Sequence, residues 1–265
     1  MYSSFQLAYK YLHYYLTASN GKGHGIHSPF VFDFIKKVLN DKETYPTYSR
    51  VEELREKLLL DNTVLNVEDF GAGSSVSKSN QRTIASIAKN AAKPKKFGQL
   101  LFRMVQFYKP EQILELGTSL GITTSYLASG NPNADVFTLE GSKEIAETAT
   151  KNFQLLGLNN IGVITGNFDE TLEPAIKQLS TIDFTFIDGN HRYKPTINYF
   201  NQILRKRHNN SVLIFDDIHW SKEMEQAWEE IKLHPAVTCT IDLFFIGLVF
   251  FRSEIKEKQH FKIRF

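Results

Sequence analysis

The sequence predicts an α/β protein with a mostly parallel sheet of seven strands, and three observations support this class. After Pro110, short apolar runs alternate with helical patterns, which is typical of parallel strands joined by helices. The last two apolar runs, residues 237–241 and 244–251, are separated only by a short turn, so we expect an antiparallel last strand. The patterns before this region are mainly helical. They predict a helical N-terminal extension over residues 1–96, followed by a second domain over residues 97–265.

The strand predictions rest on short apolar runs, and the helix predictions rest on apolar residues spaced by three or four. Besides the terminal pair, we expect strands at residues 113–116, 136–139, 162–165, 182–187 and 212–215. We expect helices at residues 2–16, 51–61, 97–108, 142–156, 194–207 and 221–234. Five strands separated by helices, followed by a strand pair, indicate a Rossmann-like sheet.

Composition limits the classes of partner. The net charge is only +2, so nucleic acid is not an expected partner. No apolar run approaches the roughly 18 residues that cross a bilayer, so no membrane span is expected. A single cysteine, Cys239, excludes a disulfide framework within the chain and is expected to pack as a small apolar residue. The first residues lack the pattern of a secretion signal, and we therefore expect a cytoplasmic protein.

A glycine turn and an acidic residue occupy the positions that a nucleotide requires. The first strand is followed by the turn Gly117 to Gly121, and glycine allows a backbone to approach a ligand closely. The second strand ends at Glu140, whose carboxylate can accept both hydroxyl groups of a ribose. A second glycine-rich stretch, Glu68 to Ser74, is followed neither by an apolar helix face nor by a strand ending in an acid. We expect that stretch to be a loop of the extension.

The motifs of this region resemble those of class I S-adenosylmethionine-dependent methyltransferases, in particular the catechol and caffeoyl-coenzyme A O-methyltransferase-like branch. The resemblance covers residues 97–251 and rests on the segments ELGTSLG (115–121), LEGS (139–142), FIDGNH (186–191) and VLIFDD (212–217). It implies O-methylation of a small-molecule substrate, an activity of class EC 2.1.1.-, with S-adenosylmethionine as cofactor. It also implies that the helices of residues 1–96 cover the active site of a methyltransferase domain over residues 97–265. The implied cofactor-binding residues are Glu115, Gly117, Thr118, Ser119, Gly121, Glu140, Gly141, Ser142, Asn167, Phe168 and Asp188.

The resemblance also implies a possible divalent cation. Metal-dependent members hold a cation such as Mg²⁺ at positions that correspond to Asp188, Asp216 and Asp217. This sequence departs from them, because Asp217 replaces an asparagine and His191 stands near the position of a lysine. A metal-free enzyme with His191 or His219 as general base therefore remains an alternative. Asp188, His191 and Asp216 are the predicted catalytic residues.

Two other classes of protein remain as alternatives. A nicotinamide-dependent oxidoreductase would carry a second glycine where this sequence has Ser119, which argues against that class. A non-catalytic protein could keep the methyltransferase fold and bind a partner through its aromatic N-terminal region. A homodimer is compatible with the sequence.

Overall fold

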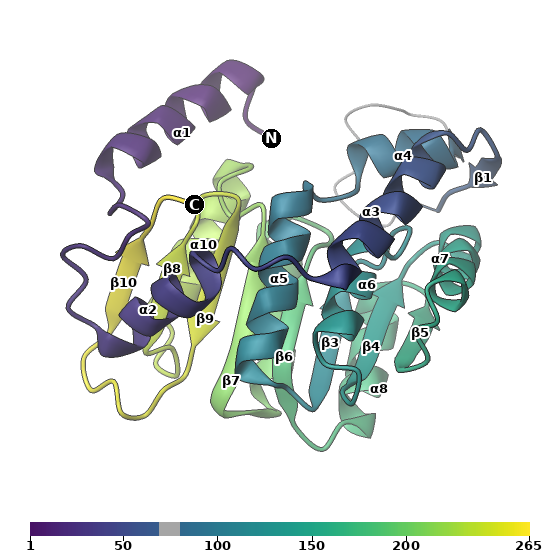
Figure 1. Ribbon diagram of the computed structural model, residues 1–265. Helices are drawn as coiled ribbons and strands as arrows, with labels where there is room; N and C mark the ends of the chain where they lie inside the picture. The colour runs from purple at the N-terminus through teal and green to yellow at the C-terminus, as the bar shows by residue number, and fades with distance from the viewer. Residues whose placement is uncertain (69–79) are drawn as a thin grey trace. The chain divides into compact units, whose positions relative to one another are not determined.

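The computed structural model describes residues 1–68 and 80–265 (Figure 1). The described chain divides into two compact units. The first unit comprises residues 1–41 and 180–265, and the second comprises residues 42–179. These units do not follow the expected boundary between residues 96 and 97, which stays a prediction. Residues 69–74 of the glycine-rich loop expected at Glu68 to Ser74 lie outside the described residues.

The second unit is built on three parallel strands in the order β3-β4-β5. These strands are β3 (Gln112–Leu116), β4 (Asp135–Glu140) and β5 (Ile161–Thr165). Leu114 pairs with Phe137, and Phe137 pairs with Gly162. The side chains of Ile113 and Leu114 are fully buried although they point to opposite faces of the sheet. A continuous apolar run of this kind is typical of a parallel strand that is covered on both faces.

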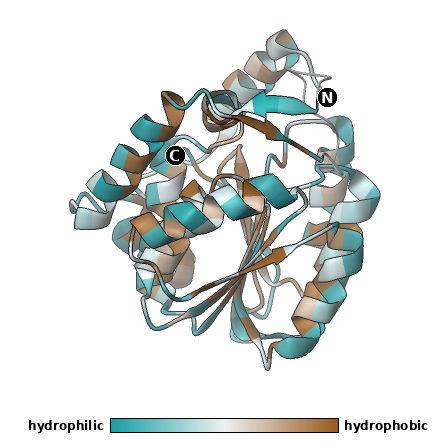
Figure 2. Ribbon diagram, turned by 90° about the vertical axis from the view of Figure 1, so that its right-hand side faces the viewer, coloured by the Kyte–Doolittle hydropathy of each residue, from teal (hydrophilic) through white to brown (hydrophobic). Residues whose placement is uncertain are grey.

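Helices and one short hairpin complete the second unit. The helices are α3 (Pro46–Leu59), α4 (Ile84–Asn90), α5 (Lys95–Tyr108), α6 (Ile122–Gly130), α7 (Lys143–Leu155) and α8 (Phe168–Gln178). The hairpin pairs β1 (Val64–Asn66) with β2 (Gln81–Thr83) in antiparallel direction. Helix α5 buries Phe97, Leu101 and Met104 along the predicted apolar stripe. In Figure 2 the helices carry hydrophilic and hydrophobic bands side by side, as amphipathic helices do.

The first unit has five strands in the order β10-β8-β9-β7-β6. They are β6 (Ile182–Ile187), β7 (Arg207–Asp216), β8 (Cys239–Asp242), β9 (Ile246–Phe250) and β10 (Gln259–Lys262). Strand β9 runs antiparallel to both β7 and β8, as expected for the last of the seven predicted strands. All seven predicted strands are present, and the α/β class is confirmed. Strand β10 is an eighth strand that the sequence did not indicate, and it pairs in parallel with β8.

The helices of the first unit are α1 (Ser4–Thr17), α2 (Pro29–Phe34), α9 (Tyr193–Leu204) and α10 (Lys222–Leu233), with a π-helical turn, η1 (Ile35–Leu39), after α2. Ser3 and Gln6 form a capping box that starts α1. The helix expected at 194–207 ends earlier, at Leu204, because β7 already begins at Arg207. None of the described helices combines the length and the apolarity that a bilayer crossing requires.

The structure confirms that Cys239 packs as a small apolar residue. Its side chain is fully buried in β8, and burial raises the pKa of the thiol to about 12. A thiol with such a pKa is protonated at neutral pH and is a poor nucleophile. We therefore do not expect Cys239 to act as a nucleophile.

Candidate functional site

In the second unit, the turn after β3 requires unusual backbone angles. Gly117, Ser119 and Gly121 all have positive φ, at 105°, 49° and 80°. A Cβ atom at Gly121 would lie 2.4 Å from Cε1 of the Phe153 ring, so the turn needs glycine there for space as well as for conformation. Ser119 adopts a conformation that costs a residue with a side chain some energy, and such strain is typical of functional loops. The predicted turn at residues 117–121 is therefore present.

Glu140, the last residue of β4, is held by this turn. The amide N–H of Ser119 donates to Oε2 of Glu140 at 2.8 Å, and the amide N–H of Ser142 donates to Oε1 at 3.0 Å. Hydrogen bonds from backbone N–H groups to a carboxylate are strong and directional. They fix the orientation of the Glu140 side chain, which is partly exposed, beside the turn.

Glu115 and Thr118, both predicted to bind the cofactor, lie beneath the turn. Both side chains are buried, Glu115 completely. The Glu115 carboxylate accepts hydrogen bonds from Thr124 Oγ1 and, at 2.6 Å, from Thr138 Oγ1. The hydroxyl groups of Thr118 and Thr138 are 2.6 Å apart. This buried network joins β3, β4 and α6, and it supports the turn from below.

The loops after β4 and β5 bring the remaining predicted cofactor residues to the same edge of the strands. The amide N–H of Gly166 donates to the carbonyl of Glu140 at 2.8 Å, which links the two strand ends. Gly141, Asn167 and Phe168 are all partly exposed there. The Asn167 side chain accepts from the amide of Asp169 at 3.0 Å and caps α8. Asn167 thus has a structural role at this edge.

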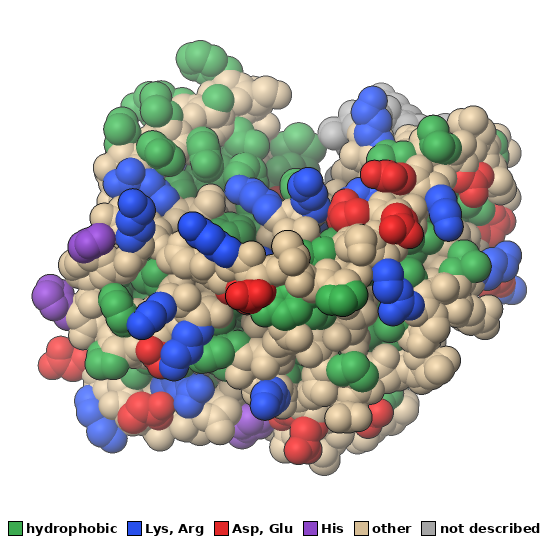
Figure 3. Space-filling model, in the orientation of Figure 1, with side chains coloured by type: hydrophobic (Ala, Val, Ile, Leu, Met, Phe, Trp, Pro, Cys, Tyr) green, Lys and Arg blue, Asp and Glu red, His purple; other side chains and the backbone are tan. Residues whose placement is uncertain are grey.

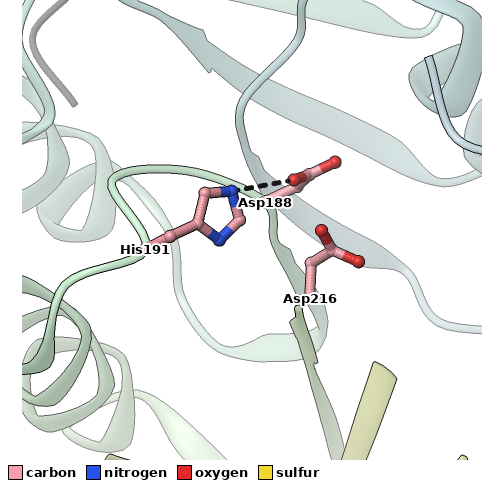
Figure 4. A group of neighbouring side chains, drawn as sticks. All are labelled: Asp188, His191 and Asp216. Atoms are coloured by element: carbon pink, nitrogen blue, oxygen red, sulfur yellow. Dashed lines mark ion pairs between the residues drawn. The ribbon is translucent and has the colours of Figure 1, made fainter. Parts of the chain in front are cut away.

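In the first unit, Asp188, His191 and Asp216 form a compact group. Each offers a ligand atom, and these atoms all lie within 4.8 Å of one another. Figure 4 shows the three side chains turned toward one another, with His191 Nε2 3.4 Å from Asp188 Oδ1. Asp188 follows β6, and the fully buried Asp216 ends β7. The structure thus brings the three predicted catalytic residues together.

Asp217, the third predicted metal ligand, is not a member of this group. Its φ is 53°, and its amide N–H donates to the carbonyl of Phe245 at 2.7 Å. His191 takes part instead, because the tight turn after β6 gives Asn190 and His191 positive φ angles of 67° and 43°. That turn folds the His191 ring back toward Asp188. The site therefore offers two carboxylates and one imidazole.

His219 lies between two carboxylates. Its Nδ1 is 3.0 Å from Glu225 Oε1, and its Nε2 is 2.9 Å from Asp242 Oδ2. Burial alone lowers the pKa of His219, but the hydrogen bonds and charges of Asp242 and Glu225 outweigh burial and raise it above its ordinary value. Both ring nitrogens of His219 already face carboxylates, and this disfavours His219 as the general base for a substrate.

Glu225 extends this network to the N-terminal helix. It accepts from Tyr2 Oη at 2.7 Å and from Lys10 Nζ at 3.0 Å. Burial raises the pKa of Glu225, but the donors Tyr2, Lys10 and His219 together lower it below its ordinary value. No sequence signal indicated these contacts, since Tyr2 and Glu225 are more than 200 positions apart.

The N-terminus also contacts the loop after β7. The amide N–H of Tyr2 donates to the carbonyl of Trp220 at 3.0 Å, and the Trp220 ring lies 5.7 Å from the His191 ring between centroids. Tyr2 and Trp220 thus connect the start of α1 to the group of Asp188, His191 and Asp216. The N-terminal residues therefore contribute to the shape of this site.

Part of this chain resembles methyltransferases in sequence. Residues 114–218 match the family model of a methyltransferase domain. The chain is 29% identical over 124 residues to a catechol O-methyltransferase of Niastella koreensis, covering 46% of this chain and 55% of that protein. It is 34% identical over 80 residues to a tRNA (guanine-N(7)-)-methyltransferase of Mycoplasma mobile, covering 30% of this chain and 40% of that protein. The chain thus spans about half the length of the curated relatives it matches.

The fold agrees with solved methyltransferases. The structure of a methyltransferase of Podospora anserina with bound S-adenosylhomocysteine aligns with a TM-score of 0.59 at 14% identity, covering 85% of this chain and 97% of that one. The chain therefore has the class I methyltransferase fold, and residues 114–218 resemble a methyltransferase domain in sequence. The predicted resemblance to the O-methyltransferase-like branch is confirmed.

The His219 network predicts a pH-dependent contribution to stability. Because the pKa of folded His219 is raised, its contribution is fully present below the ordinary histidine pKa near 6.5 and is lost as pH rises through the folded pKa. We expect His219→Gln to lower the free energy of unfolding by about 1–3 kcal/mol at pH 6 and by less at pH 9. Urea unfolding at both pH values measures this difference. His13→Gln, at an exposed position of α1, is the control, and an equal deficit at both pH values would contradict the ion-pair assignment.

Proposed function

We propose that this protein is an S-adenosylmethionine-dependent methyltransferase that methylates an oxygen atom of a small molecule. The observation that carries the proposal is the Glu140 carboxylate, oriented by the amides of Ser119 and Ser142 beside a strained glycine turn. The proposal includes a cytoplasmic location. The single, fully buried Cys239 supports it, because a protein without disulfides suits a reducing compartment.

The second unit supplies the proposed nucleoside site. The two oxygens of Glu140 can accept the two hydroxyl groups of a ribose, and charged acceptors make such bonds strong. The turn at Gly117 to Gly121 brings backbone close to the ligand, and Gly141, Ser142, Asn167 and Phe168 lie at the same strand ends. Asp188 is assigned to the methionine end of the cofactor on the family resemblance. The similarity to proteins named as methyltransferases supports S-adenosylmethionine as the nucleoside that binds there.

When bound, S-adenosylmethionine would supply an electrophilic methyl group to the acceptor oxygen, and the electron pair of the broken carbon–sulfur bond would stay on sulfur. The protein must orient the acceptor and remove its proton. His191 is the proposed general base in a metal-free reaction, because its ring lies 3.4 Å from Asp188, which can stabilise the imidazolium that forms. Asp216 is the second carboxylate of this group and is proposed to orient the acceptor.

The same group could hold a divalent cation. Two carboxylates and one imidazole suit Mn²⁺ and related cations, whereas Mg²⁺ prefers oxygen ligands alone. A cation held by Asp188, His191 and Asp216 would lower the pKa of an acceptor hydroxyl. In that case His191 is a ligand and cannot be the base. Asp217 stays a predicted ligand from the family pattern.

Other functions have less support. A nicotinamide cofactor would need a close pyrophosphate approach at Ser119, whose side chain occupies the position of the required glycine. The tRNA methyltransferase relative matches 30% of this chain, and the net charge of +2 gives no electrostatic reason for a nucleic-acid substrate. A non-catalytic protein of this fold would not need the oriented Glu140.

Glu140→Ala tests the nucleoside site. We expect the dissociation constant of S-adenosylhomocysteine, measured by isothermal titration calorimetry, to increase more than about tenfold, because the ribose hydroxyls lose a charged acceptor. Glu147→Ala, an exposed acidic position on the adjacent helix α7, is the matched control and should bind as the wild type does. Unchanged affinity in Glu140→Ala would remove Glu140 from the site.

Asp188→Asn tests the acidic group. We expect Mn²⁺ affinity, measured by titration, to fall at least about tenfold and turnover to be lost, since an amide is a weaker ligand than a carboxylate. Asp217→Asn is the control, and it should bind Mn²⁺ like the wild type if the cation occupies the three-residue group. If Asp217→Asn loses as much affinity as Asp188→Asn, the aspartate set predicted from the family is correct. Full activity of Asp188→Asn would exclude Asp188 from the mechanism.

A further inference from the structure

Helix α1 is apolar on two opposite faces. Its inner face consists of Leu7, Tyr11 and Tyr14, continued by Ala18, and it packs on Phe244 and Phe245 near the end of β8. The spacing of four, three and four residues keeps these side chains on one side of a helix. This face, together with the bonds of Tyr2 and Lys10 to Glu225, holds α1 on the first unit.

The outer face repeats the same spacing two positions earlier, and it is exposed. Phe5, Tyr9, Leu12 and Leu16 are 83%, 67%, 56% and 72% exposed. A shift of two residues turns a helix by about 200°, so the two sets point in opposite directions. Figure 3 shows hydrophobic side chains gathered over α1 at the upper left of the molecule. We call Phe5, Tyr9, Leu12 and Leu16 the outer seam.

A helix with two opposite apolar faces is normally covered on both of them. Within the described residues, α1 buries only Tyr14, although it contains five aromatic or leucine residues on exposed positions. Contiguous exposed apolar patches of this kind mark interaction surfaces. The outer seam therefore needs a partner.

Charge limits the kind of partner. Lys10 is the only lysine, arginine or acidic residue between Ser4 and Thr17, and it is turned inward to Glu225. The outer seam is consequently uncharged and offers nothing to a partner recognised by charge. A spacing of four, three and four is the a/d pattern by which two α-helices pack against each other. A second seam of identical composition is complementary to it.

We propose that the outer seam of α1 pairs with the outer seam of a second copy of this chain, around a two-fold axis. Such an interface is isologous, with each copy presenting the same patch. The seam with its neighbours Met1 and Tyr15 exposes on the order of 600 Å² per copy, close to the roughly 800 Å² per partner of a standard stable interface. The exposed apolar area is thus of the size that a dimer needs. The proposal does not depend on the proposed function.

A lipid surface is the main competing partner, and α1 lacks its features. Helices that lie on membranes carry lysine and arginine along the face opposite the apolar one. The face of α1 opposite the outer seam is occupied by Leu7, Tyr11 and Tyr14, which pack on the protein itself. The observations therefore favour a second copy of the chain.

Sedimentation equilibrium of the full chain tests the proposal. We expect a wild-type dimer, and we expect Leu12→Glu to increase the dimer dissociation constant at least about tenfold, because association would bury a charge. His13→Glu is the matched control, since it places the same charge one position along at an exposed residue outside the seam. Circular dichroism checks that both variants are folded. Leu16→Gln is a second seam variant without added charge, and it should also weaken association.

Three results would overturn the proposal. The first is a wild-type chain that remains monomeric at about 100 μM, a concentration that would reveal even a weak interface. The second is a wild-type dimer that Leu12→Glu and Leu16→Gln weaken no more than His13→Glu does. The third is a monomer that floats with phosphatidylcholine vesicles unless Leu12 is replaced by glutamate, which would assign the outer seam to a lipid surface.

Discussion

The orientation of a single carboxylate organises the second unit of this protein. Glu140 ends β4 and accepts hydrogen bonds from Ser119 in the turn after β3 and from Ser142 at the start of α7. Its backbone carbonyl also accepts from Gly166 after β5. Three loops that follow three neighbouring strands are thus tied to one residue. The buried bonds of Glu115 to two threonines support the same turn from below, so a nucleoside site there would be preorganised.

Seven strands could be predicted because each is a short apolar run that must be buried. Two of the differences from the predicted elements concern polar strand residues. Strand β10 contains His260 and Lys262 and alternates between partly buried and exposed positions, so only its pairing with β8 makes it a strand. The start of β7 at Arg207 is polar as well, and His208 is placed by a bond to Asp183 at 2.7 Å. Such segments become strands because they pair with neighbouring strands, and their own hydrophobicity does not predict a strand.

Much of the candidate site could also be predicted, because carboxyl ends of parallel strands lie at one edge. That rule alone places Glu140 near the glycine turn, and Asp188 near Asp216. It does not indicate that the turn after β6 folds His191 back while Asp217 stays outside the group, since positive φ at Asn190 and His191 depends on the surrounding chain. The network of Tyr2, Lys10, Glu225, His219 and Asp242 joins segments far apart in sequence. Only the folded chain brings these charges together, and it attaches α1 to the loop after β7.

Calorimetric titration of the wild-type protein with S-adenosylmethionine, and separately with NAD⁺, tests the central claim most directly. The oriented Glu140 carboxylate and the glycine turn at residues 117–121 predict saturable binding of S-adenosylmethionine at one site per chain and no binding of NAD⁺. Binding of NAD⁺ in place of S-adenosylmethionine would identify a nicotinamide-dependent protein. If S-adenosylmethionine gave no binding heat, the proposed methyltransferase activity would be contradicted, and only the assignment of the fold would remain.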